Sequence, residues 1–178
     1  MNGYTHKIGG TCAALVATCL ALQEPFSTDK LIVAGCIVAA AGIGSLLPDI
    51  DHKNSTISKK HKITSWIMTH LFEHRGFTHA PLIQLMFLAI LFYFGKNLGG
   101  IVQYAYLGTV IGLGIGLLSH TFLDWLTVGG IPLLYPFTKR KFHLMSLKTS
   151  KHSKGTAVFI VLLTIAIIGV KAYFVFLA

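Results

Sequence analysis

The stretch GTVIGLGIGLLSHTFLDWL, residues 108–126, is an apolar segment that carries two ionisable side chains near its end. Three glycines recur every four residues from Gly108 to Gly116, so they share a helix face and let another backbone approach closely. His120 and Asp124 are also four residues apart and share a face. Ionisable groups at membrane depth are costly and mark function by default. The stretch therefore predicts a membrane helix that packs through its glycines and carries a polar site at one end.

The composition of the 178-residue chain is that of a membrane protein. Hydrophobic residues make up 53% of the sequence and charged residues only 12%, against about 25% charged residues in an average soluble domain. The net charge of +9 comes from 15 Lys and Arg against 6 Asp and Glu. In a multi-pass protein such basicity is typical of cytoplasmic loops that face anionic headgroups. We expect one integral membrane domain over residues 1–178.

Apolar stretches along the chain predict an all-α, multi-pass helical bundle with about five membrane spans. The expected spans are residues 8–22, 31–47, 81–94, 101–127 and 156–177. The first and third are short against the roughly 17–25 residues that a spanning helix needs. A signal peptide is the less favoured interpretation of the first stretch, because no clean cleavage site follows it.

Lysine and arginine set the expected orientation. Most of them lie in two long connections, residues 48–79 and 129–155, whereas the two short connections carry only Lys30 and Lys96. Positively charged loops stay in the cytoplasm. Five alternating spans then give a cytoplasmic N-terminus and an outward C-terminus.

Histidine and aspartate gather at the expected cytoplasmic ends of four helices. They precede the first span, follow the second, precede the third and lie near the end of the fourth. The topology was assigned from Lys and Arg alone, so this convergence is an independent result, and it predicts a shared metal site. The candidate ligands are His6, Asp49, Asp51, His52, His74, His79, His120 and Asp124.

Each part of this pattern also has a simpler interpretation. A single His-x-x-x-Asp pair is at least as often a hydrogen-bonded structural pair, and an aspartate after Pro48 is often a solvated turn. Pro48 would end the second helix or let it turn, and Gly76 offers a turn that could bring His74 and His79 together. The remaining histidines are expected outside the site: His61, His70, His143 and His152.

Three motifs closely resemble those of the YdjM-type family of bacterial membrane-bound metal-dependent hydrolases: LPDIDH (47–52), HRGFTHA (74–80) and SHTFLDWLTVGGIPLLYPF (119–137). The resemblance runs from THKIGG near the N-terminus to about Phe137. It implies a small multi-pass protein of the inner membrane with a hydrolase-type metal centre at the eight candidate ligands. Ala80 stands where many members have Ser. More distantly, the His/Asp pattern is similar to that of zinc-dependent phospholipase C and single-strand nucleases, which hydrolyse phosphodiesters with clustered zinc ions.

Eight candidate ligands exceed the four of one tetrahedral zinc ion. They fit two or three Zn²⁺ ions, with Mn²⁺ or Fe²⁺ as alternatives, and a two-metal site suits phosphoester hydrolysis. Asp51 or Glu73 is expected to act as general base, and Arg75 to meet a phosphate. The cluster Lys139–Lys141 is expected to gather anionic lipid headgroups. The leading hypothesis is a hydrolase of a membrane-located phosphoester, with a lipid as the expected substrate.

Two other classes of function compete with this hypothesis. A metal-ion or proton transporter, or a metal-binding membrane protein without hydrolytic activity, is the alternative, because intramembrane His and Asp also form ion paths. The clustering at one end favours a site over a path. Nucleic acid is not an expected partner, since apart from Tyr135, Phe137 and Phe142 the basic loops lack interleaved aromatics for base stacking. The sequence gives no prediction for the oligomeric state.

Overall fold

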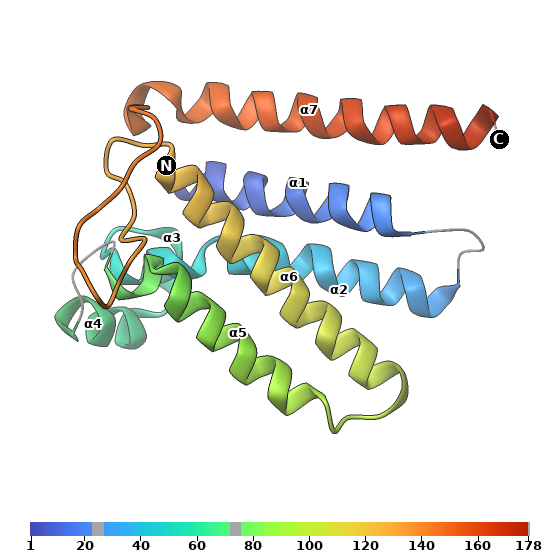
Figure 1. Ribbon diagram of the computed structural model, residues 1–178, viewed down its shortest axis with the longest axis horizontal. Helices are drawn as coiled ribbons and strands as arrows, with labels where there is room; N and C mark the ends of the chain where they lie inside the picture. The colour runs from blue at the N-terminus through green and yellow to red at the C-terminus, as the bar shows by residue number, and fades with distance from the viewer. Residues whose placement is uncertain (23–26, 72–75, 178) are drawn as a thin grey trace.

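The computed structural model describes residues 1–22, 27–71 and 76–177, and these form a bundle of helices (Figure 1). In chain order the elements are α1 (Gly3–Ala21), α2 (Thr28–Gly44), the 3-10 helix η1 (Leu47–Asp51), α3 (Thr56–Lys60), α4 (Lys62–Leu71), the 3-10 helix η2 (Phe77–His79), α5 (Pro81–Gly95), α6 (Gly100–Trp125) and α7 (Thr149–Leu177). Extended structure in the described residues is limited to two isolated bridges, Thr127 with Leu147 and Ile131 with Phe142. The all-α prediction is confirmed.

The long helices coincide with the five predicted apolar stretches. Of the described helices, three are long and apolar enough to cross a membrane, over Thr28–Asp51, Gly100–Trp125 and Lys151–Leu177. At 15 residues, α5 is shorter than a usual span. The helical membrane-protein class is confirmed, whereas the count of five spans and the cytoplasmic N-terminus stay predictions.

Two helices begin earlier than the sequence indicated. His6 was expected before the first span but lies inside α1, because the Asn2 side chain accepts a hydrogen bond from the Thr5 amide and caps the helix there. The connection 129–155 was expected to reach residue 155, yet α7 begins at Thr149. Basic residues such as Lys151 are good helix formers, so the apolar pattern underestimates the length of this helix.

Helices α2 and α6 pack closely through the predicted glycine face. A Cβ added at Gly112 would lie 2.2 Å from the carbonyl oxygen of Ile37, and one at Gly116 would lie 2.3 Å from that of Ala41. These are backbone-to-backbone contacts that only glycine permits. Around this pair, α1 contacts both helices, α5 packs on α6 and α7 packs on α1 (Figure 1).

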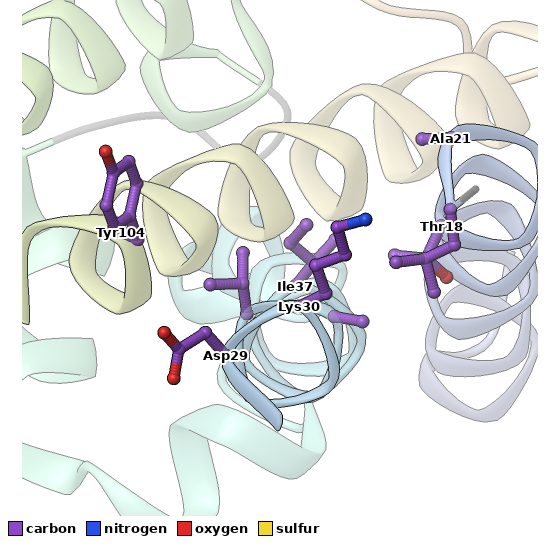
Figure 2. Close-up of a pocket in the computed structure, with 9 residues that line it drawn as sticks. Thr18, Ala21, Asp29, Lys30, Ile37 and Tyr104 are labelled. Carbon is purple, nitrogen blue, oxygen red and sulfur yellow. The ribbon is translucent and has the colours of Figure 1, made fainter. Parts of the chain in front are cut away.

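The two ends of the bundle differ. One end gathers the start of α1, the turns η1 and η2, the short helices α3 and α4 and the segment that leads to α7 (Figure 1). The opposite end carries the start of α2, the start of α6 and the end of α7. There a cavity of about 400 Å³ lies between α1, α2 and α6, beside Thr18, Lys30 and Tyr104 (Figure 2).

Candidate metal centre

The end of the bundle that holds η1 and η2 also holds the predicted His/Asp side chains. Pro48 lies in the first turn of η1, which carries the aspartates past the end of α2, and Pro81 starts α5 directly after η2. The contributions are His6 from α1, Asp49 and Asp51 from η1, His79 from η2, and His120 and Asp124 from α6. All of these except Asp49 are buried. Two groups of three donor residues occur here among the described residues, with ligand atoms within 4.8 Å of one another, and they share His120.

The first group joins α1 to α6 through His6, His120 and Asp124. The rings of His6 and His120 stack with their centroids 3.7 Å apart and their planes at 15°. Nε2 of His6 lies 3.3 Å from Oδ1 of Asp124, and Nε2 of His120 lies 3.7 Å from Oδ2 of the same carboxylate. The amine of Met1 also contacts Asp124. The predicted shared face of His120 and Asp124 is therefore turned toward α1.

The second group joins the turns to α6 through Asp49, His79 and His120. The two Nε2 atoms of the histidines are 3.1 Å apart. Oδ1 of Asp49 lies 3.9 Å from Nε2 of His79 and 3.8 Å from Nε2 of His120. The side chain of Asp49 is 14% exposed, whereas both histidines are fully buried. This group thus forms the more open side of the centre.

Neighbouring groups fix which nitrogen of His79 and of His120 carries the proton. Nδ1 of His120 lies 2.7 Å from the carbonyl oxygen of Ser45, which can only accept, so Nδ1 donates and Nε2 keeps a lone pair. Thr78 donates its hydroxyl hydrogen to Asp51 at 2.6 Å. Its oxygen is then an acceptor for Nδ1 of His79, 3.0 Å away, and the Asp51 carboxylate lies 3.5 Å from the same nitrogen. Both Nε2 lone pairs therefore point into the space between the two groups.

This arrangement fits a transition-metal ion. Two nitrogens that bind one tetrahedral zinc ion at about 2.0–2.1 Å stand about 3.3 Å apart, close to the 3.1 Å between the Nε2 atoms of His79 and His120. Nδ1 of His6 is buried without a hydrogen-bond partner among the described residues, and its Nε2 has only the Asp124 carboxylate, 3.3 Å away; such a buried nitrogen is unfavourable unless another species binds there. A mixed set of imidazole and carboxylate ligands suits zinc, manganese or iron.

The other predicted site residues fall into three sets. Asp51 lies on the Nδ1 side of His79 and outside both groups. His52 is half-buried, accepts a hydrogen bond from the amide of Asn54 at 3.2 Å and joins neither of the groups formed by the described residues. Glu73, His74 and Arg75 lie outside the described residues. The four histidines expected outside the site are all exposed: His61, His70, His143 and His152.

Three neighbours of the centre were missed from the sequence. Ser45 contributes a backbone carbonyl, which no residue pattern reveals. Thr78 stands next to a candidate ligand, but its hydroxyl gave no signal of its own. Gln84 is buried, donates to the carbonyl of Thr78 at 2.9 Å and accepts from Thr121 at 3.0 Å. An amide inside the apolar stretch 81–94 is a signal that could have found it.

Comparison with known proteins agrees with the motifs. The family described as "YdjM inner membrane protein" matches residues 1–178. The chain is 35% identical over 156 residues to "Uncharacterized protein YvsG" of Bacillus subtilis (strain 168), which covers 86% of this chain and 85% of YvsG. It is 39% identical over 100 residues to "Inner membrane protein YdjM" of Escherichia coli (strain K12), which covers 56% of this chain and 49% of that protein. No solved structure matches the chain. The family resemblance and the inner-membrane localisation predicted from the sequence are confirmed.

Proposed function

The chain belongs to the YdjM family of inner membrane proteins, and we propose that it is a metal-dependent hydrolase of a phosphoester located in the membrane. The observation that carries this proposal is the convergence of the His79 and His120 Nε2 atoms with the carboxylates of Asp49 and Asp124 at one buried end of the bundle. Buried His and Asp side chains of this kind, brought together from several helices, are typical of catalytic sites.

In this proposal the two groups hold two zinc ions. His6 and Asp124 would hold one ion and Asp49 and His79 the other, and His120, which belongs to both groups, would offer its Nε2 to one of them. When bound, such ions polarise a phosphoryl oxygen and make a nucleophile of water at neutral pH. A metal-binding histidine usually donates a hydrogen bond from the N–H of its other ring nitrogen to a carboxylate or carbonyl, which sets the orientation of the ring and raises the basicity of the nitrogen that binds the metal. The Ser45 carbonyl fits that role at His120, and at His79 it falls to the Thr78 hydroxyl oxygen, which is itself oriented by Asp51.

The placement of Asp51 bears on the choice of general base. Asp51 is buried, accepts the hydroxyl of Thr78 and faces Nδ1 of His79. These contacts support an orienting role for Asp51 rather than removal of a proton from the attacking water. Asp49 is partly exposed at the open side of the centre, and we assign it both metal contact and proton removal. Arg75 and the exposed Arg140 remain proposed contacts for the phosphate and for anionic headgroups.

Transport is the competing class, and the packing of α2 on α6 favours hydrolysis over it. A path across the bundle would connect the metal centre with the cavity at the opposite end (Figure 2). Between them, at Gly112, the backbones of α2 and α6 are closer than even a Cβ permits. A closed helix pair of this kind supports a site at one end rather than a continuous path.

Elemental analysis of the purified protein tests the proposal first. Wild type is expected to carry at least one stoichiometric transition metal, which is lost in His120→Ala because His120 belongs to both ligand groups. The matched control is His143→Ala, which removes an exposed histidine away from the centre. Thermal unfolding of each variant separates loss of metal from loss of fold. Wild-type protein without bound metal would refute the proposal, and zinc transport by reconstituted vesicles without hydrolysis would reverse the ranking of the two classes.

A further inference from the structure

A groove of about 500 Å³ runs along α5 beside the metal centre. Apart from Thr64, Thr78 and Gln84 its lining is apolar. Four lining side chains, Ile83, Met86, Phe87 and Ile90, follow the spacing of one helix face. The volume falls within the range of about 300–1,000 Å³ that is usual for small-molecule sites.

One end of the groove lies beside the metal centre, on the Nδ1 side of His79: Thr78 lines it and lies 3.0 Å from that nitrogen. Pro48 precedes Asp49, and Leu117 lies one helical turn before His120. Thr78 precedes His79 and donates its hydroxyl to Asp51. Gln84 links η2 to α6 at this end of the groove, since it donates to the carbonyl of Thr78 and accepts from the hydroxyl of Thr121. The lining is therefore polar only near the centre and beside α4, where Thr64 lies.

From this end the groove follows α5 away from the metal centre. Ile83 and Ile90 are seven residues apart, which is roughly 10 Å along a helix that rises 1.5 Å per residue. Helix α5 starts at the end of the bundle that holds the centre and runs toward the opposite end (Figure 1). Met86, Phe87 and Ile90 are all exposed, so this part of the groove is open on the side that a membrane protein turns to lipid. The groove is thus polar beside the metal centre and apolar farther along α5, and a membrane lipid has the same order, from a polar headgroup to an apolar chain.

We propose that this groove binds one acyl chain of a membrane phospholipid and so holds its phosphoester at the His/Asp centre. The inference rests on the proposed hydrolase function and narrows its substrate to a lipid with a long chain rather than any phosphoester near the membrane. The closeness of the groove to the centre through Thr78 and its polar-to-apolar order favour a lipid over a helix of another protein.

Two tryptophan variants on α5 form a matched pair. Met86 lines the groove and is 55% exposed, while its neighbour Leu85 is 54% exposed and does not line it. Met86→Trp fills the groove, and Leu85→Trp adds the same bulk on the lipid-facing side. Both are expected to keep the metal content and melting temperature of the wild type, because neither residue contacts a ligand group.

The binding assay uses the protein as purified and non-hydrolysable phosphonate analogues of dioleoyl and dihexanoyl phosphatidic acid. Wild type and Leu85→Trp are expected to bind the dioleoyl analogue more tightly than the dihexanoyl analogue. Met86→Trp is expected to weaken binding of the dioleoyl analogue about tenfold or more, because several methylene groups lose their buried contacts. Its binding of the dihexanoyl analogue should stay unchanged. Equal dioleoyl binding by the two variants overturns the inference.

A hydrolysis assay with the two natural phosphatidic acids separates this inference from the proposed function. If neither lipid is cleaved while only Met86→Trp loses dioleoyl binding, the groove is a lipid site and hydrolysis of this phosphoester is refuted. If both lipids are cleaved and Met86→Trp cleaves dioleoyl phosphatidic acid as fast as Leu85→Trp does, the hydrolase stands and the groove inference fails. A change of oligomeric state in Met86→Trp alone would identify a protein helix as the occupant and would also overturn it.

Discussion

Substitution of Gly116 by alanine tests how the packing of the bundle supports the metal centre. The added Cβ would lie 2.3 Å from the carbonyl oxygen of Ala41 and 2.6 Å from the amide nitrogen of Ser45. Ordinary contact begins near 3.4 Å, and a packed interior has few voids to absorb the difference, so α2 must move from α6 by roughly 1 Å. The atoms in the way are backbone atoms, which cannot rotate aside as a side chain would.

Two consequences follow from that displacement. Overpacking of this kind lowers the free energy of unfolding by about 1–3 kcal/mol. The hydrogen bond from Nδ1 of His120 to the carbonyl of Ser45, now 2.7 Å, would lengthen beyond the usual limit of about 3.2 Å. Loss of such an orienting contact typically lowers metal affinity about 10–100-fold. We therefore expect Gly116→Ala to reduce stability and zinc affinity together.

Thermal unfolding in detergent and a zinc titration against a chelating dye measure the two effects. Gly114→Ala is the control, because its added Cβ would meet only the end of the Leu88 side chain, at 3.3 Å. That side chain can shift, so the control should stay within about 0.5 kcal/mol of wild type. If Gly116→Ala matches Gly114→Ala in both measurements, the close approach of α2 to α6 at Gly116 is refuted. If it unfolds earlier but binds zinc normally, the coupling through Ser45 is refuted.

Three further substitutions test contacts around this packing. Asp51→Asn should lower zinc affinity about 10–100-fold in the same titration, because the carboxylate that faces His79 loses its charge. Normal zinc affinity together with lost activity would instead assign Asp51 to proton transfer. Thr78→Val should also weaken zinc binding, since it removes both the donor to Asp51 and the acceptor for Nδ1 of His79. Thr78→Ser should restore binding, and a failure of the serine to rescue would rule out the hydroxyl. Lys171→Met should lower the unfolding free energy by about 1–2 kcal/mol without changing metal content. The reason is that the Lys171 ammonium donates to the carbonyl of Leu22 at 2.8 Å and so joins α7 to the end of α1. An unchanged melting temperature would show that this contact contributes nothing to stability.

The helices were predictable because the membrane imposes a simple rule on sequence. Backbone polar groups must be satisfied within the segment, so long apolar runs become helices, and the glycine period from Gly108 to Gly116 identified the face that packs on α2. Helix ends were less predictable, because they depend on local capping and on polar residues that tolerate helix. The Asn2 cap and the early start of α7 at Thr149 are examples.

The sequence placed at one end five of the residues that meet there, His6, Asp49, His79, His120 and Asp124, but it did not separate Asp51 and His52 from them or show which atom faces which. Charge in the loops set the expected topology, and the topology placed His6, His79 and His120 at one end of the bundle. The orienting groups could not be predicted in the same way. The carbonyl of Ser45 belongs to the backbone, and its position depends on the approach of two helices that are distant in sequence. Sequence spacing also gave no means to separate the role of Asp49 from that of Asp51.

The conformation of η1 supplies the physical reason for that difference. In a 3-10 helix there are about 3.0 residues per turn, so side chains two positions apart point in directions about 120° apart. Asp49 and Asp51 therefore address opposite edges of the same ring, with Asp49 3.9 Å from Nε2 of His79 and Asp51 3.5 Å from its Nδ1. In the proposed centre Asp49 would bind metal, while Asp51 accepts the Thr78 hydroxyl and so leaves the Thr78 oxygen to accept the Nδ1 proton that keeps Nε2 available. The Asp-x-Asp spacing is thus required by the two roles, and either aspartate moved by one position would leave one edge of His79 without its carboxylate.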